Sequence, residues 1–174
     1  MSDSDFQLET HSQRVEVLLR NGRCLSGWMF LRPAAGRHLG AETIEDRLNE
    51  SNSFFPLASE LAQAPTREAL LIAKACIVYV KAQKPTDDRS RSARASSSEV
   101  RVSLELTCDE SITGMIYVAL PQGRSRTLDW LNGQNTFLPV IVEKQIYYVN
   151  RDAICTAKDH NPSVTVPPLA AENS

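Results

Sequence analysis

Several features that mark specialised protein classes are missing from this sequence. Its longest apolar stretches, residues 69–80 and 114–120, are interrupted by Lys74 in the first case and far too short to cross a bilayer in the second. The N-terminus is polar and acidic, so it resembles neither a signal peptide nor a transit peptide. We therefore expect a cytoplasmic protein that does not bind a membrane.

An excess of positive charge is also lacking. The chain has 19 lysines and arginines against 21 aspartates and glutamates, which gives a formal net charge of −2. Such a balance provides no general positive field that would attract nucleic acid or anionic lipid. Hydrophobic residues make up 42% of the chain and charged residues 23%, as in an ordinary globular domain.

The residue groupings that metal, nucleotide or nucleophile chemistry requires are not found either. No two histidines lie within one helical turn of each other, so a zinc or iron site is not expected. The seven glycines form no phosphate-binding motif. The three histidines are His11, His38 and His160. We expect no metal, no cofactor and no enzymatic activity.

Cysteine is scarce, and no CxxC pair occurs. The four cysteines lie singly in apolar segments that are typical of strands: Cys24, Cys76, Cys108 and Cys155. We expect buried, reduced thiols rather than disulfides.

One twelve-residue segment occurs twice in the chain. DRLNESNSFFPL at 46–57 and DWLNGQNTFLPV at 129–140 are identical at six of twelve positions. The similarity extends to residues 15–37 against 102–124, and to residues 70–80 against 147–157. A repeat of this length indicates two copies of one structural unit.

The segment between the two copies has a different composition. It is rich in serine and arginine and has no large apolar residue, which is typical of a flexible linker. We predict five parts along the chain: a flexible N-terminus (1–13), a first repeat (14–82), a disordered linker (83–99), a second repeat (100–158) and a flexible tail (159–174).

Each copy begins with apolar residues at every second position, which indicates half-buried strands. Asn21-Gly22 predicts a type I′ hairpin turn, because both central residues of that turn need a positive φ. Gly27 and Gly114 occupy the same place in the two copies and predict a sharp bend or a bulge in a tightly curved sheet. Five short strands per copy predict a mainly β protein made of two small closed barrels.

The repeated words themselves are typical of one helical turn between the second and third strands. We expect Thr43 or Thr127 to begin that turn, and Asn49 or Asn132 to end it in the left-handed conformation. The aspartates are expected to bond turn amides rather than to form a catalytic pair, the leucines to plug the barrel, the phenylalanines to enter the core, and the prolines to mark a strand edge or bulge. The repeated residues are Asp46, Leu48, Asn49, Phe54, Pro56, Asp129, Leu131, Asn132, Phe137 and Pro139.

The segments VEVLLRNGRCLSGWMFL and LLIAKACIVYV carry a family resemblance. An NG turn, a second strand containing L-x-G and a closing strand pair around Lys74-Ala75-Cys76-Ile77 resemble the Sm-like fold, including the bacterial RNA chaperone Hfq. The D-x-L-N…F word is similar to an uncharacterised bacterial domain family without assigned activity. The resemblance implies two tandem five-stranded Sm/SH3-like barrels. The one-turn helix expected between strands 2 and 3 of each barrel comes from the repeated words, which are not a hallmark of the Sm family. Where that family has an RNA-contacting histidine, this chain has Ala75 and Asp152.

The resemblance also implies RNA binding as one possible function. The basic residues that would contact phosphate are Arg37, Lys74, Arg124, Arg126 and Arg151. The loop arginines among them suit equally well a structural role, in which they bond loop carbonyls or Asp46 and Asp129. The Arg/Ser run in the linker has the simpler interpretation of a solvated spacer.

A second apolar strand face, opposite the predicted interior, indicates a different function. It carries Leu18, Trp28, Phe30, Met115, Tyr117 and Tyr148. These residue types are enriched in interface cores, so we expect some of them to join the two barrels and others to bind an identical chain or a protein partner. The leading hypothesis is therefore a non-enzymatic interaction or assembly module; RNA binding is the alternative, and an enzyme is the least favoured.

Overall fold

The computed structural model describes residues 11–33, 40–59, 69–84, 97–118 and 127–160. Most of the predicted linker, residues 1–10 of the predicted N-terminus (1–13) and nearly all of the predicted tail lie outside the described residues, whereas residues 11–13 belong to a strand. The described elements fall into a first half, residues 11–84, and a second half, residues 97–160. The predicted domain boundaries themselves stay a prediction.

Both halves contain the same elements in the same order. The first half consists of β1 (His11–Leu19), β2 (Cys24–Leu31), α1 (Ile44–Leu48), β3 (Phe54–Ala58), β4 (Ala69–Ala73), the 3-10 turn η1 (Lys74–Cys76) and β5 (Ile77–Gln83). The second half consists of β6 (Ser98–Leu106), β7 (Ser111–Val118), α3 (Thr127–Leu131), β8 (Phe137–Val142), β9 (Gln145–Asn150), the 3-10 turn η2 (Arg151–Ala153) and β10 (Ile154–Asp159). The mainly β class and the short helix after the second strand are confirmed.

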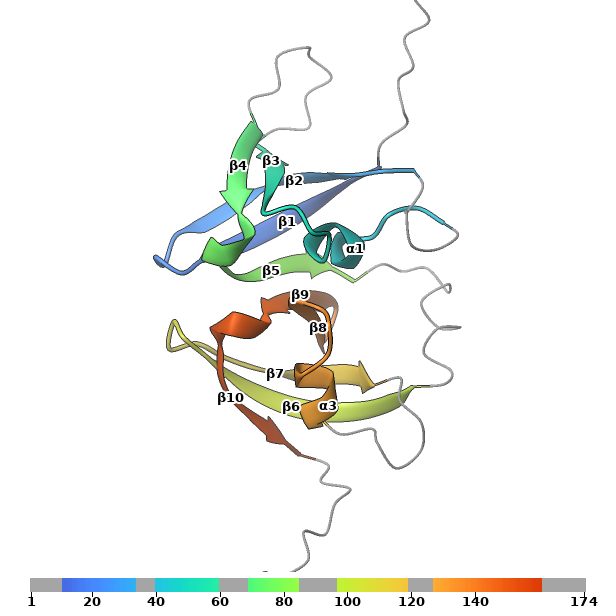
Figure 1. Cartoon of the computed structure of the whole chain (residues 1–174), viewed down its shortest axis with the longest axis vertical. Helices are drawn as coiled ribbons and strands as arrows, with labels where there is room; N and C mark the ends of the chain where they lie inside the picture. The colour runs from blue at the N-terminus through green and yellow to red at the C-terminus, as the bar shows by residue number, and fades with distance from the viewer. Residues whose placement is uncertain (1–10, 34–39, 60–68, 85–96, 119–126, 161–174) are drawn as a thin grey trace, which may run out of the picture.

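The ten strands form one antiparallel sheet rather than two separate barrels. Their order is β10-β6-β7-β8-β9-β5-β1-β2-β3-β4, and the sheet is not closed. The two curled halves are stacked along the long axis of the molecule, with β5 and β9 facing each other in the middle (Figure 1). The prediction of two closed barrels is therefore not confirmed. Alternating apolar residues show that one face of a strand is buried, but they do not say which strand pairs with its edge.

The first hairpin has a different turn from the one predicted. Only Gly22 has a positive φ, of 80°, and the Leu19 amide donates to the Arg23 carbonyl. Asp109 has a φ of 61° at the corresponding place of the second half, where the Leu106 amide donates to the Glu110 carbonyl. A three-residue loop needs the left-handed conformation at one residue only, so the type I′ prediction is wrong.

The glycines of β2 and β7 allow two strands to approach closely. A Cβ at Gly27 would lie 2.5 Å from the Ala58 carbonyl oxygen, and one at Gly114 would lie 2.5 Å from the Ile141 carbonyl oxygen. In each half the crossing is confined to one residue pair, Trp28 with Ala58 in the first. Glycine is therefore required for contact with β3 and β8, in agreement with the predicted tight curvature.

The repeated words fold largely as predicted around α1. The Thr43 side chain accepts from the Asp46 amide at 3.1 Å, and the Asp46 carboxylate accepts from the Thr43 amide at 2.9 Å. This is a capping box. Asn49 ends the helix with a φ of −93°, so the predicted left-handed cap is wrong. Thr127 lies inside α3, where its hydroxyl donates to Asp159 at 2.6 Å.

The aromatic residues of the repeated words differ between the halves. Phe137 is fully buried as predicted, but Phe54 is 55% exposed and its neighbour Phe55 is buried instead. Leu48 is buried and Leu131 half-buried. Pro56 does not interrupt the β2–β3 ladder, because that pairing is limited to Ala58. The prediction for Phe54 is wrong because its side chain lies at an end of the sheet, where nothing in the described chain covers it.

Two apolar clusters make up the core, and each takes residues from both halves. The first-half cluster includes Phe137, Ile146 and Tyr148 from the second half. The second-half cluster includes Leu18 and Val78 from the first half. The two halves therefore share their apolar interior across the β5–β9 pairing.

Candidate functional site at the open sheet edges

The junction between the halves shows how one half binds the other. β5 pairs with β9 over five residue pairs, from Tyr79 with Val149 to Gln83 with Gln145. The Tyr79 and Tyr147 rings meet edge to face, with centroids 5.2 Å apart. Continuous main-chain pairing plus aromatic contact is the arrangement that strand addition produces.

The side-chain amide of the residue that ends α1, Asn49, strengthens this junction. Asn49 donates from Nδ2 to the Phe137 carbonyl at 3.0 Å and accepts the Phe137 amide at 2.9 Å. Asn135 donates to Glu45 at 3.3 Å. Burial, and then the neighbouring Asp46, raise the pKa of Glu45. The backbone of Phe137 is thus held by α1 much as a strand would hold it.

A buried amide of the second half completes the junction. Asn150 is 2% exposed and donates to the carbonyls of Ile77 at 2.9 Å and Lys74 at 3.3 Å. These bonds satisfy polar groups that would otherwise be costly to bury at this place.

The two end strands of the sheet, β4 and β10, each have one strand neighbour among the described residues. They lie toward opposite ends of the long axis of the molecule (Figure 1). Edge strands present unpaired main-chain groups and are ready templates for a further strand. These two edges are the candidate functional site.

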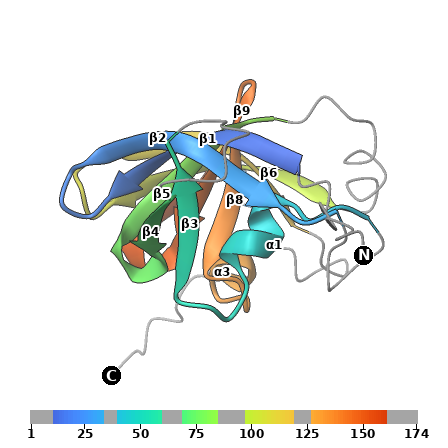
Figure 2. The ribbon, with the colours of Figure 1, turned by 90° about the horizontal axis from the view of Figure 1, so that it is seen from above.

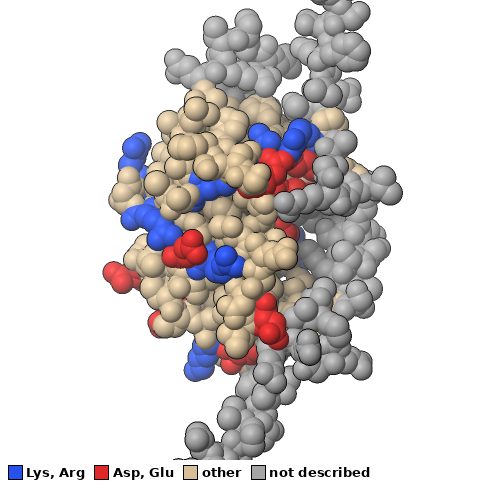
Figure 3. Space-filling model, in the orientation of Figure 1, with Lys and Arg blue, Asp and Glu red and all other residues tan. Residues whose placement is uncertain are grey.

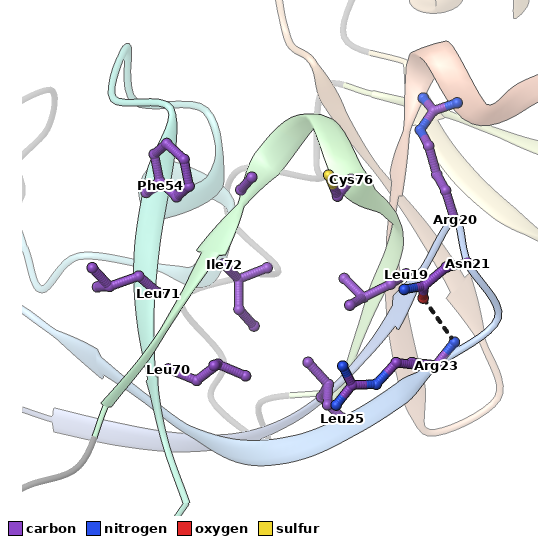
Figure 4. A pocket seen from close by; sticks show the side chains of 11 residues that line it. Leu19, Arg20, Asn21, Arg23, Leu25, Phe54, Leu70, Leu71, Ile72 and Cys76 are labelled. Carbon is purple, nitrogen blue, oxygen red and sulfur yellow. Dashed lines mark hydrogen bonds between the residues drawn. The ribbon is translucent and has the colours of Figure 1, made fainter.

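The β4 edge is strongly apolar. All five residues of β4 (ALLIA) are apolar, and Leu70 and Leu71 are 53% and 68% exposed. Phe54 lies on the neighbouring strand β3, which runs beside β4 (Figure 2), and lines the same groove as these leucines. A groove of about 370 Å³ opens here, with Leu19 and Ile72 pointing into it from opposite sides (Figure 4).

The rim of this groove is polar. Arg20, Asn21 and Arg23 of the first hairpin border it, and the Arg20 side chain donates to the Ala75 carbonyl at 3.0 Å. On the face shown in Figure 3, lysines and arginines are interspersed with aspartates and glutamates within a surface that is mainly uncharged. An apolar centre with a polar rim is typical of a protein-binding surface.

The β10 edge is less apolar than the β4 edge and exposes no large hydrophobic residue among those described. Cys155, Thr156, Ala157 and Lys158 are all exposed. Nearby α3 is linked to β10 through the Thr127–Asp159 hydrogen bond and exposes Leu128 by 60%.

The six residues of the predicted apolar face are divided between the junction and the surface. Leu18 and Tyr148 are buried, each in the cluster centred on the other half, and Tyr117 packs against the first-half cluster. Trp28, Phe30 and Met115 are half-buried. Their role in binding a partner stays a prediction.

The structure describes two of the five basic residues that were predicted to contact phosphate, Lys74 and Arg151. Arg37, Arg124 and Arg126 lie outside the described residues. Lys74 is 7% exposed, and its Nζ donates to the Arg47 carbonyl, the Glu50 carbonyl and the Asn52 side chain at 3.0, 3.0 and 2.7 Å. An ammonium has three protons, so these acceptors use all of them.

The environment of Lys74 also affects its protonation. Burial, together with the nearby Arg47 charge, lowers the pKa of Lys74 to about 8. Arg151 is half-buried and donates to the Gly133 carbonyl. The two described residues of the predicted phosphate-binding set therefore anchor the loops after α1 and α3.

Four charged residues form an ionic cluster beside α1. Glu42 is 3% exposed and accepts from the Arg32 amide at 2.7 Å and from its guanidinium at 2.8 Å. Glu50 pairs with both Arg32 and Arg47. Two positive and two negative charges balance each other, so the cluster serves to brace the loop that enters α1.

The thiols are more exposed than predicted. All four cysteines are free; Cys24, Cys76 and Cys155 are exposed and Cys108 is half-buried. The expectation of burial is wrong because Cys76 and Cys155 lie at the two open edges, which the sequence suggested were closed. Asp46 caps α1 and Asp129 is exposed on α3, each in its own half.

The sequence pattern missed Leu70 and Leu71 as functional candidates. Their signal was the unbroken apolar run of β4 (ALLIA) in place of the alternation seen in β1; adjacent apolar residues occur again at Tyr147 and Tyr148 in β9. Apolar residues on both faces of a short strand indicate that both faces need cover.

Within the described ranges, no three potential ligands gather as a metal site would require. None of the helices there has the length and apolar content needed to span a bilayer. Comparison of the chain with protein-family models, with curated proteins and with solved structures finds no match.

Proposed function

We propose that the protein is a non-catalytic interaction module that binds a polypeptide by accepting an additional strand at the edge of its sheet. The observation that carries this proposal is the exposure of Phe54, Leu70 and Leu71 around the groove beside β4. Proteins usually protect edge strands with charge or proline, and β4 has neither.

Binding at this edge combines two kinds of contact. Main-chain hydrogen bonds to β4 supply affinity for any extended chain, and the groove selects apolar side chains at alternate positions. The charged rim of Arg20 and Arg23 favours a partner segment with acidic or carbonyl groups next to its apolar residues.

A site-specific photocrosslinker tests the proposal in the host cell. We expect p-benzoylphenylalanine in place of Leu71 to crosslink to a polypeptide whose attached peptide is identified by mass spectrometry. The matched control carries the same group at Glu99, which is exposed on β6, an inner strand far from β4 in the strand order. Absence of crosslinking at position 71, or equal crosslinking at both positions, would contradict the proposal.

We also propose that each half is a unit of the Sm-like type. The support is the repeated order of two strands, a short helix, two strands, a 3-10 turn and a last strand, with Lys74 at the turn. Poor superposition of the two halves in an experimental structure would contradict this assignment.

RNA binding is the weaker proposal. Its support is limited to loop arginines outside the described residues, because Lys74 and Arg151 are already bonded to carbonyls. It predicts binding that weakens steeply as salt rises. A gel-shift assay with mixed RNA at low salt that shows no complex would remove it.

A further inference from the structure

The chain contains a template for the partner of its open edges. In the alignment of the two copies, β10 corresponds to β5 and β4 corresponds to β9. β5 and β9 are the two strands that pair at the junction of the halves. The two edges that lack a second strand neighbour among the described residues are therefore repeat copies of two edges that bind each other.

The exposed apolar residues occupy the positions that the junction covers. Phe54 corresponds to Phe137, which is fully buried there, and Leu71 corresponds to Tyr148, which is 6% exposed. Leu70 corresponds in the same way to Tyr147, which meets the Tyr79 ring.

Leu128 on α3 follows the same rule. Its counterpart Glu45 on α1 receives a hydrogen bond from Asn135 across the junction. All four large hydrophobic residues that the described surface exposes thus lie at counterparts of junction positions.

The β10 edge also exposes positions that are buried in its counterpart, β5. Val78 and Val80 of β5 are fully buried at the junction, and their counterparts Cys155 and Ala157 on β10 are exposed. Lys81 of β5 corresponds to another lysine, Lys158, so the edge has the same charge at that position.

The groove beside β4 also has a covered counterpart. Leu19 and Leu25 are half-buried, whereas their counterparts Leu106 and Ile112 are 3% and 6% exposed. The cluster that holds Leu106 and Ile112 includes Val78 of the first half. The first half thus covers the counterpart of the groove in the second half. Among the described residues no equivalent strand covers the groove beside β4, so it is open.

We propose that the partner of the β4 edge is β10 of a second copy of this chain. This inference rests on the proposed function of the β4 edge and names its occupant. By the junction register, Thr156 pairs with Ile72, Ala157 with Leu71, Lys158 with Leu70, and Asp159 with Ala69.

Asn132 of the second copy takes the place of Asn49 in this contact. It is exposed on the described surface just after α3, and its amide is positioned to bond the Phe54 backbone as Asn49 bonds that of Phe137. Asn150 has Ala73 as its counterpart, so its two buried hydrogen bonds are not reproduced. The contact between copies is therefore weaker than the junction within the chain.

The resulting association is head to tail. Two different surfaces meet, so each added copy leaves one free β4 edge and one free β10 edge until a ring closes or a filament grows. A two-fold dimer through two β4 edges does not reproduce the junction.

Cysteine pairs distinguish these arrangements. In a background with the four native cysteines changed to serine, and with folding checked by thermal melting, we test Leu71→Cys and Ala157→Cys. Directly opposite residues of antiparallel strands have Cβ atoms about 4.5–5.5 Å apart, so a disulfide is expected between the two single variants when they are mixed and oxidised. Each single variant on its own is expected to stay uncrosslinked. A chain that carries both cysteines is expected to form covalent oligomers of two, three and more copies, seen as a ladder of bands on a non-reducing gel.

The controls define the contrary results. Glu99→Cys on β6 is exposed and is expected not to crosslink to Ala157→Cys. Crosslinking of Leu71→Cys with itself, or no product in the mixture of Leu71→Cys and Ala157→Cys, would overturn the inference.

Sedimentation of the unmodified protein separates this inference from the proposed function. We expect the mass to rise with concentration in multiples of the chain, and Leu71→Lys to weaken the association at least about tenfold, as expected for a central apolar contact. A monomer at all concentrations, with crosslinking at position 71 to a different polypeptide in the cell, would overturn this inference and leave the proposed function intact. A monomer without any crosslinking would overturn both.

Discussion

At the residue scale, Lys74 shows how a charged side chain can serve structure rather than binding. It lies in η1, between the edge strand β4 and the junction strand β5, and its ammonium holds three acceptors of the segment after α1. The lysine therefore fixes the short helix to the turn that joins the edge strand β4 to the junction strand β5.

The pH dependence of unfolding tests this placement of Lys74. Its pKa falls from the ordinary value of 10.5 to about 8 in the folded protein. Between these values the unfolded chain binds more protons, so the Lys74 contribution to the free energy of unfolding rises with pH from about 8 to about 10.5. Urea unfolding of the wild type and of Lys74→Met across this range measures it.

The comparison with Lys74→Met isolates the lysine, because all other titrating groups are shared. We expect the wild type to gain stability relative to the variant as the pH rises. A constant difference between the two proteins over this pH range would show that Lys74 titrates normally.

Single residues were the hardest part to predict from the sequence. The twelve-residue words place Phe54 and Phe137 at equal positions, yet one is exposed and the other buried. The difference comes from neighbours, since Phe137 lies at the junction and Phe54 at a free end. Hydrophobicity along the chain does not contain that information.

At the element scale, the strands were predictable because alternation and glycine placement report local geometry. Gly27 and Gly114 indicated curvature in both copies, and the structure shows the close strand crossing that needs them. The cap of α1 followed from Thr43 and Asp46 for the same reason. Edge pairing was not predictable, because both strand edges carry the same main-chain groups whatever the side chains.

The strand crossing makes a testable claim about Gly27. In Gly27→Ala the new methyl meets a backbone oxygen and the Leu57 side chain at 2.5 and 2.7 Å, so β3 must move away from β2. We expect a loss of about 1–3 kcal/mol in the free energy of unfolding, as for other overpacked sites. Urea unfolding monitored by circular dichroism measures this change.

Gly133→Ala provides the matched control. Its nearest neighbour would be the Trp130 carbonyl oxygen at 3.2 Å, and its φ is not positive, so a much smaller effect is expected. Equal losses for both variants would mean that the crossing does not depend on Gly27.

At the scale of the whole molecule, the repeat was visible in the sequence but the way the copies join was not. Two similar units can form two separate closed barrels or one continuous sheet, and the same alternation of apolar residues along the strands is compatible with both. The structure resolves this by the β5–β9 pairing and by amides from α1 and β9, whose partners are distant in sequence. Under the association proposed above, the same continuation accounts for the exposed apolar residues at the β4 end.

The two equivalent asparagines test this continuity between the junction and the free ends. Asn49→Ala removes both side-chain bonds to the Phe137 backbone, so we expect it to destabilise the isolated chain by about 1–3 kcal/mol and to increase hydrogen exchange in β8. Asn132→Ala removes an exposed amide, so we expect it to leave the stability of the single chain within about 0.5 kcal/mol of wild type while weakening self-association. Urea unfolding at low concentration and sedimentation at high concentration separate the two effects. If Asn132→Ala destabilised the single chain as much as Asn49→Ala does, or left self-association unchanged, the two asparagines would not be serving equivalent edges of the same repeated unit.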